Sequence, residues 1–158
     1  MKGERDIVAI ELDAKSIVRW SPEVEHERAV AVFDLLEGNR FRLRDGPPGP
    51  YRLVLGLRDG TLIFSLESQE QGGERLEIEL PVRPLRRVIK DYFLICESYF
   101  QAIKTATPSK IETIDMARRG VHDEGAGLLR EALETRVDMD HDTARRLFTL
   151  VCVLHIRG

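Results

Sequence analysis

The sequence has only two cysteines and no long apolar run, which excludes several protein classes. Cys96 and Cys152 lie in apolar stretches without a Cys-x-x-Cys spacing. We therefore expect buried, reduced thiols rather than a disulfide framework or a zinc cluster. The longest apolar run, Leu147 to Ile156, is far shorter than the roughly 20 residues that a membrane span needs. No signal peptide precedes the first strand pattern, so we expect a cytoplasmic protein without membrane contact.

Motifs that are specific for catalysis or for cofactors are also missing. There is no phosphate-binding loop, no Gly-x-Gly-x-x-Gly, no Gly-x-Ser-x-Gly and no His-Glu-x-x-His. The segment Gly125-Ala-Gly127 is too short to cradle a phosphate. We therefore predict no cofactor, and the sequence identifies no catalytic residue.

An excess of charge of one sign is absent too, because the net charge is −3. This balance provides no general basic field, so nucleic acid is not an expected partner. The charge is uneven along the chain, however: residues 1–80 hold 11 Lys/Arg against 16 Asp/Glu, and residues 81–158 hold 13 against 11. An anionic partner would therefore bind the second half. A hydrophobic content of 42% over 158 residues predicts one folded domain, residues 1–158.

The first half of the chain reads mainly as strands. Residues 7–13 and 40–43 are predicted strands. Between them, Ser21-Pro22 is predicted to begin a helix, and Gly38 is predicted to end it in the left-handed conformation. Residues 45–50 must form a loop because they contain three prolines. An antiparallel meander is predicted next. Its strands are residues 51–57, 62–66 and 76–80, and its turns lie at Asp59-Gly60 and at residues 69–73.

The second half reads as helices. Apolar spacings of three and four predict a helix from Leu85 to Ile103 and another that starts at Thr107-Pro108. Gly120 is expected to weaken or break that helix, with a further helix around Leu128. Asp140 to Asp142 begins the last helix, which is apolar on nearly all sides after Arg146, although its β-branched residues also permit a strand. Such a helix is expected to be central to the core or buried between subunits.

The predicted class is α+β. An N-terminal strand and helix and an antiparallel meander come first, and a C-terminal block of three to four helices packs on one face of the sheet.

Arginine pairs are the most informative feature of the second half. They are Arg86-Arg87, Arg118-Arg119 and Arg145-Arg146. Asp115 and Asp142 each lie three and four residues before one of these pairs, which allows ion pairs within a helix. We expect such structural pairing to predominate. The alternative is an anion-binding site in which part of each pair stays available for phosphate or carboxylate.

Three of the four histidines lie among acidic residues. Glu23 and His26 have the spacing of half a carboxylate-bridged metal site, but no second half accompanies them, so no metal is predicted. His122 is the best candidate for an acid or base beside an arginine clamp, because it follows Arg119 near the possible helix break.

Four long segments resemble the uncharacterised protein family numbered 0262, a set of short bacterial cytosolic proteins. They are Ser21–Leu36, Ile89–Tyr99, Ile114–Gly120 and Asp142–Leu154. The resemblance covers nearly the whole chain and implies one full-length domain with no partner domain. It implies no activity, ligand or residue role.

The sequence leaves two functional hypotheses open. The first is a non-catalytic regulatory or protein-interaction domain that self-associates, as a homodimer for example, through apolar helix surface. The second is a protein or small enzyme that binds a phosphorylated or carboxylated metabolite. Its clamp would be Arg118, Arg119, Arg145 and Arg146, with Arg86 and Arg87 as further candidates, and His122 would handle protons.

Overall fold

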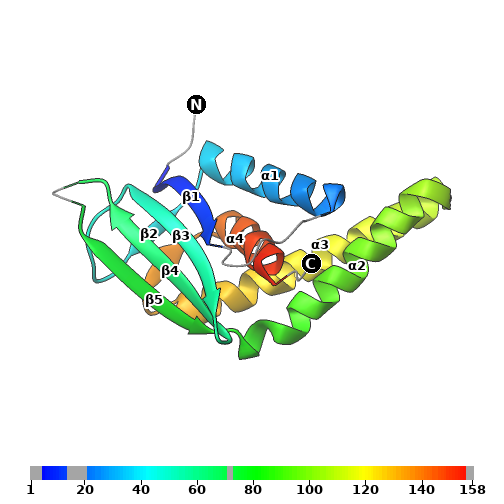
Figure 1. Ribbon diagram of the computed structural model, residues 1–158. Helices are drawn as coiled ribbons and strands as arrows, with labels where there is room; N and C mark the ends of the chain where they lie inside the picture. The colour runs from blue at the N-terminus through cyan, green and yellow to red at the C-terminus, as the bar shows by residue number, and fades with distance from the viewer. Residues whose placement is uncertain (1–4, 14–20, 71–72, 156–158) are drawn as a thin grey trace.

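The computed structural model describes residues 5–13, 21–70 and 73–155. A four-stranded sheet has the order β1 (Ile7–Asp13), β3 (Tyr51–Arg58), β4 (Thr61–Ser68) and β5 (Arg75–Pro81). A small sheet pairs β2 (Phe41–Leu43) with β6 (Val137–Met139). The helices are α1 (Pro22–Glu37), α2 (Arg86–Thr105), α3 (Pro108–Leu133) and α4 (His141–Leu154), and a short 3-10 turn, η1 (Arg83–Leu85), precedes α2. The helices gather on one side of the main sheet (Figure 1), which confirms the predicted α+β class.

The main sheet contains the predicted meander and one parallel strand. Strands β3, β4 and β5 pair antiparallel, and the turn at Asp59-Gly60 has positive φ at both residues, as the sequence predicts. Strand β1 pairs with β3 in parallel. Leu55 of β3 stands opposite Phe64 of β4, and both are fully buried against the helices. In the predicted turn at 69–73, residues 71 and 72 lie outside the described ranges.

Helix α1 begins as its sequence predicts but ends differently. The Ser21 hydroxyl accepts a hydrogen bond from the Val24 amide at 3.2 Å, which caps the first turn. Gly38 has φ −173°, so the predicted left-handed ending is wrong. Asn39 anchors this end of the helix instead. Its buried amide exchanges two hydrogen bonds with the backbone of Ile7 and donates a third to the Leu35 carbonyl.

Helices α2 and α3 form a long antiparallel hairpin (Figure 1). The expected break at Gly120 is wrong, because α3 is continuous over 26 residues. Thr107 caps its start by accepting a hydrogen bond from the Lys110 amide at 3.3 Å. Gly120 lowers helix propensity by about 0.8–1.0 kcal/mol relative to alanine, but the helix continues because α3 packs on α2 and α4.

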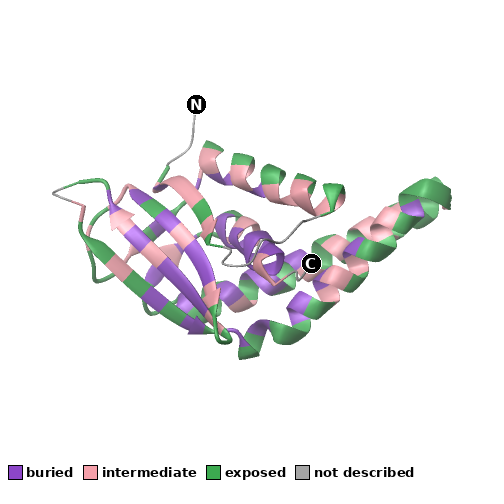
Figure 2. Cartoon of the chain, viewed as in Figure 1, coloured by how far each residue is buried: buried purple, intermediate pink, exposed green. Residues whose placement is uncertain are grey.

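Helix α4 fills the space between α1, α3 and the sheet. Asp140 caps its first turn by accepting a hydrogen bond from Thr143 at 2.9 Å. Side chains from Leu147 to Val153 are buried on all sides of the helix (Figure 2), so the expectation of a central core helix is confirmed. The alternative of a strand is wrong for the described part of this segment, and Ile156 lies outside it.

The contact between α3 and α4 is unusually close at Gly125. A Cβ atom at this position would lie 2.4 Å from the ring of Phe148. Only hydrogen fits there, so the two helices approach more closely than any other residue at position 125 would allow. Strand β6, which the sequence analysis does not predict, then ties the start of α4 to β2 through antiparallel pairing.

Candidate functional site

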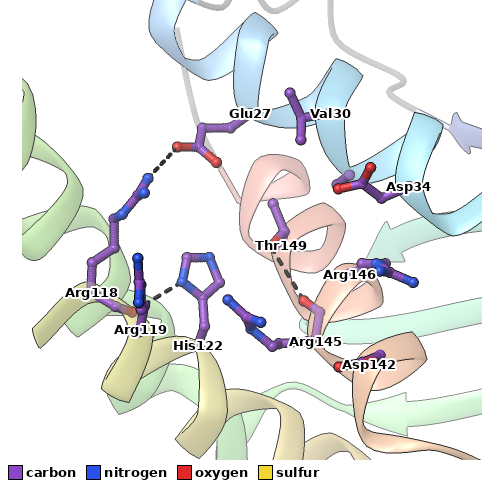
Figure 3. A pocket seen from close by; sticks show the side chains of 11 residues that line it. Glu27, Val30, Asp34, Arg118, Arg119, His122, Asp142, Arg145, Arg146 and Thr149 are labelled. Atoms are coloured by element: carbon purple, nitrogen blue, oxygen red, sulfur yellow. Dashed lines mark hydrogen bonds and ion pairs between the residues drawn. The ribbon is translucent and has the colours of Figure 1, made fainter. Parts of the chain in front are cut away.

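A pocket of about 210 Å³ opens between α1, α3 and α4 (Figure 3). It contains five of the seven predicted site residues, which come from two helices that are separate in the sequence. The charged and polar residues that line it are Glu27, Asp34, Arg118, Arg119, His122, Asp142, Arg145, Arg146 and Thr149. Val30 and Ala31 of α1 provide the apolar part of the wall.

Arg118 is the most constrained of the four arginines. Its guanidinium donates to Glu27 on α1 at 2.8 Å and to Asp115 one turn earlier at 3.0 and 3.3 Å. It also lies over the ring of Tyr99, 4.3 Å from the centroid. Burial opposes its charge, but Glu27 and Asp115 outweigh burial, so the pKa of Arg118 is above its ordinary value. Arg118 therefore acts as a structural tie between α1 and α3.

The other three arginines keep free donors toward the pocket. Arg119 shares Asp115 at 2.9 Å, yet its side chain is 68% exposed against 22% for Arg118. The Nε atom of Arg145 lies 3.7 Å from Asp123, beyond hydrogen-bond distance. Arg146 donates once, to the Gly38 carbonyl at 3.3 Å. Since a guanidinium carries five N–H donors, most of the donors on these three residues have no partner within the described ranges.

His122 lies at the floor of the pocket between α3 and α4. Its Nδ1 is 3.0 Å from the Arg118 carbonyl oxygen, which can only accept, so Nδ1 carries the proton. Tyr92 packs against the imidazole edge to face, with ring centroids 5.1 Å apart, and fixes its orientation. Burial lowers the pKa of His122, and the charges of Arg145 and Arg118 lower it further. The ring is therefore neutral at neutral pH. It lies inside a continuous helix, not at the expected break.

The α1 side of the pocket carries carboxylates. Glu27 is engaged by Arg118, whereas Asp34 has no ion pair among the residues that the structure describes. Figure 3 shows Asp34 on the same side as Arg146, with Arg119, His122 and Arg145 across the opening. Asp142 of α4 also lines the pocket. Among the described residues it forms no ion pair with Arg145 or Arg146, so the predicted pairing within α4 is wrong, whereas Asp115 pairs with both arginines of α3.

Arg86 and Arg87 do not belong to this site. They lie at the start of α2, beside the turn between β3 and β4, and both are exposed. Arg87 is 87% exposed and lies 3.9 Å from Asp91. The two residues are useful as a reference, because they form an arginine pair outside the pocket.

Some of the acidic neighbours of the histidines form ion pairs. Glu27 binds Arg118, and Asp123 lies 3.1 Å from Nε2 of His141. Across residues 5–13, 21–70 and 73–155, no three His, Cys, Asp or Glu side chains come together as metal ligands would. In the same ranges, no helix has both the length and the apolar character that a bilayer crossing requires.

The contribution of α1 is what the sequence analysis missed. Glu27 and Asp34 are seven residues apart, a spacing that places both on one face of a helix, and Thr149 follows Arg145 by one turn. Those spacings could have suggested which residues share a surface. They could not show that this face of α1 meets the arginine-bearing faces of α3 and α4.

Fold and site together define a small α+β protein with an arginine-lined pocket between helices. The sequence pattern of the uncharacterised protein family UPF0262 matches residues 4–157, and the chain belongs to this family. It is 54% identical to the UPF0262 protein of Rhodospirillum rubrum over 158 residues, which cover 100% of this chain and 97% of that protein. Identity is 58% over 153 residues with the Brucella canis protein, covering 96% of this chain and 94% of its relative. No solved structure matches the chain.

Proposed function

We propose that the protein binds a small phosphorylated or carboxylated anion in the pocket between α1, α3 and α4, held by Arg119, Arg145 and Arg146. One observation carries this proposal: three guanidinium groups line one cavity and keep unused donors there. Planar guanidinium forks match the oxygens of carboxylate and phosphate. A cavity of about 210 Å³ is smaller than most drug-sized ligand sites, so the ligand is a small ion or metabolite.

The existing ion pairs do not prevent such binding. Exposed pairs contribute only about 0–1 kcal/mol each, and the side chains of Arg119 and Arg145 are 68% and 41% exposed in their pairs with Asp115 and Asp123. A hydrogen bond to a charged ligand contributes about 1.5–3 kcal/mol. The bound anion would therefore gain more from these guanidinium groups than their present partners lose. Arg118 stays with Glu27 and keeps the wall of α1 in place.

Binding is tested by titrating the full chain with inorganic phosphate and with lactate and following the melting temperature. A ligand at 100 times its Kd stabilises a fold by about 2.7 kcal/mol, which raises the Tm of a chain of this size by about 5–10 °C. An unchanged Tm with both probes at tens of millimolar would argue strongly against the proposal.

A matched pair of double variants separates a specific site from general attraction to positive charge. Arg119→Gln with Arg145→Gln removes two pocket charges and should weaken binding at least about tenfold. Arg86→Gln with Arg87→Gln removes the same charge outside the pocket and should leave Kd within about twofold, because exposed distant charges are screened by salt. Equal losses in both variants would mean that binding is not at this pocket.

Self-association is a second proposal, and it needs a surface other than α4. That helix is buried within a single chain, so its apolar character is explained without a partner. Exposed Val30 and Phe33 on α1 support a contact through that helix instead. Light scattering over a concentration series tests it, and a monomer mass at every concentration would contradict it. A cytoplasmic location is likewise a proposal, supported by two cysteines that are both free thiols.

A further inference from the structure

One ring nitrogen in the pocket has no partner, and its chemistry constrains the ligand. His122 is more than nine-tenths buried, and its Nδ1–H is committed to the Arg118 carbonyl. Figure 3 shows the other nitrogen, Nε2, directed into the opening between α1 and α4. Within the described ranges Nε2 has no hydrogen-bond partner. In the neutral ring this nitrogen bears a lone pair and can only accept.

The groups that surround the imidazole keep it in this state. Arg118 and Arg119 lie on α3, Arg145 and Thr149 on α4, and Tyr92 packs on the ring from α2. Glu27 on α1 also lines the pocket but is paired with Arg118. Asp123, whose charge acts on the imidazole, is paired with His141. The Thr149 hydroxyl donates to the Arg145 carbonyl at 3.3 Å and is not available to the imidazole. The pocket thus places a hydrogen-bond acceptor among arginines.

We propose that His122 Nε2 accepts a hydrogen bond from the bound anion, so that the pocket selects oxyanions that carry a hydroxyl group over those that carry none. This inference rests on the proposed function, and it narrows the ligand class to hydrogen phosphate or a 2-hydroxycarboxylate. The arginines donate to the charged oxygens, which only accept, and His122 Nε2 accepts a hydrogen bond from the hydroxyl group, whose proton stays on the ligand. An anion without that proton directs an oxygen lone pair at the nitrogen lone pair and leaves a buried acceptor unsatisfied.

Two pairs of probes isolate the hydroxyl group. Phosphate and sulfate are tetrahedral oxyanions of similar size, but at neutral pH only phosphate keeps an O–H. Lactate and propionate are three-carbon carboxylates, and only lactate carries the hydroxyl. Wild-type protein should bind phosphate at least about tenfold tighter than sulfate, or lactate at least about tenfold tighter than propionate, by isothermal titration. Whichever pair discriminates shows whether the charged end is a phosphate or a carboxylate.

His122→Phe tests the residue itself. Phenylalanine preserves a ring against Tyr92 but has no acceptor, so the hydroxyl preference should fall to about one while some affinity for both anions remains. His26→Phe is the matched control, because His26 is exposed on α1 and does not line the pocket. It should keep the wild-type preference.

The possible outcomes separate this inference from the proposed function. Equal binding of both members of each pair by the wild type, unchanged in His122→Phe, overturns the inference and leaves an anion site. Failure of all four probes to bind overturns both. A measurement on the wild type covers the case in which His122→Phe does not fold. The imidazole ¹⁵N spectrum should keep Nε2 unprotonated, and shifted, when phosphate binds, whereas a protonated Nε2 in the complex would contradict the inference.

Discussion

Replacing Gly125 by alanine should destabilise the protein, although alanine is the better helix former. The added Cβ would lie 2.4 Å from the ring of Phe148, far inside normal contact distance. Phe148 cannot move aside easily, because it is fully buried and its ring packs edge to face on Tyr92 with centroids 6.0 Å apart. The substitution must therefore separate α3 from α4 or force Phe148 from its rotamer.

The size of the effect follows from two opposing contributions. Gly→Ala in a helix interior gains about 0.8–1.0 kcal/mol of helix propensity. Overpacking of a close-packed core costs typically about 1–3 kcal/mol. A clash this short belongs to the upper part of that range, so we expect a net loss of about 1–2 kcal/mol. For a chain of this size such a loss lowers the Tm by about 2–8 °C.

Two other glycines of α3 provide controls, because their replacement by alanine should stabilise the protein. Gly120 and Gly127 are exposed, and a Cβ at either position would meet no atom within 4 Å. Each alanine variant should gain up to about 1 kcal/mol and raise the Tm by about 2–4 °C. Urea unfolding and thermal melts of the three variants give the comparison. If Gly125→Ala is stabilised like the other two, α3 and α4 are not packed as described here.

Three further predictions concern buried polar groups. Because burial lowers the pKa of His122, the unfolded chain takes up a proton below pH of about 6.5 that the folded protein does not bind, so stability falls with acid. Urea unfolding from about pH 7.5 to 5.5 should show a shallower fall in His122→Phe, and parallel curves would refute this. Asn39→Ala leaves the buried backbone polar groups of Ile7 unpaired and should cost about 1–3 kcal/mol in the same assay, whereas unchanged stability would mean that the amide is dispensable. Cys96 and Cys152 should stay unreactive toward Ellman's reagent until the protein unfolds, because both are buried and burial raises the pKa of Cys96 to about 11; prompt labelling of the native protein would contradict their placement.

Local signals made most of the fold predictable. The turn at Asp59-Gly60 and the cap at Ser21 depend on a few neighbouring residues, and both occur as predicted. Gly120 was misleading because its weak helix propensity is outweighed by the packing of α3 on α2 and α4. Strand β6 could not be predicted, because three residues carry little pattern and its partner β2 lies almost 100 residues away.

The pocket was predictable only in part, for a similar reason. Spacing shows that Asp115 can reach Arg118 and Arg119 within one helix, and the structure has both ion pairs. It does not show that the arginines of α4 face those of α3 across a shared cavity. Sequence spacing also does not distinguish Arg86 and Arg87 from the other two arginine pairs, although tertiary packing places them outside the pocket. Convergence of side chains is a property of helix packing, which no local pattern encodes.

The place of α4 in the chain has a consequence for biosynthesis. This helix fills the centre of the molecule, yet it follows every other described element in the sequence. Until α4 has been synthesised, the sheet and the other helices lack the helix that fills the core between them. Apolar surface therefore stays open to proteases and chaperones until α4 has emerged. A chain truncated between α3 and α4 would therefore be degraded rapidly and would not form a smaller functional protein.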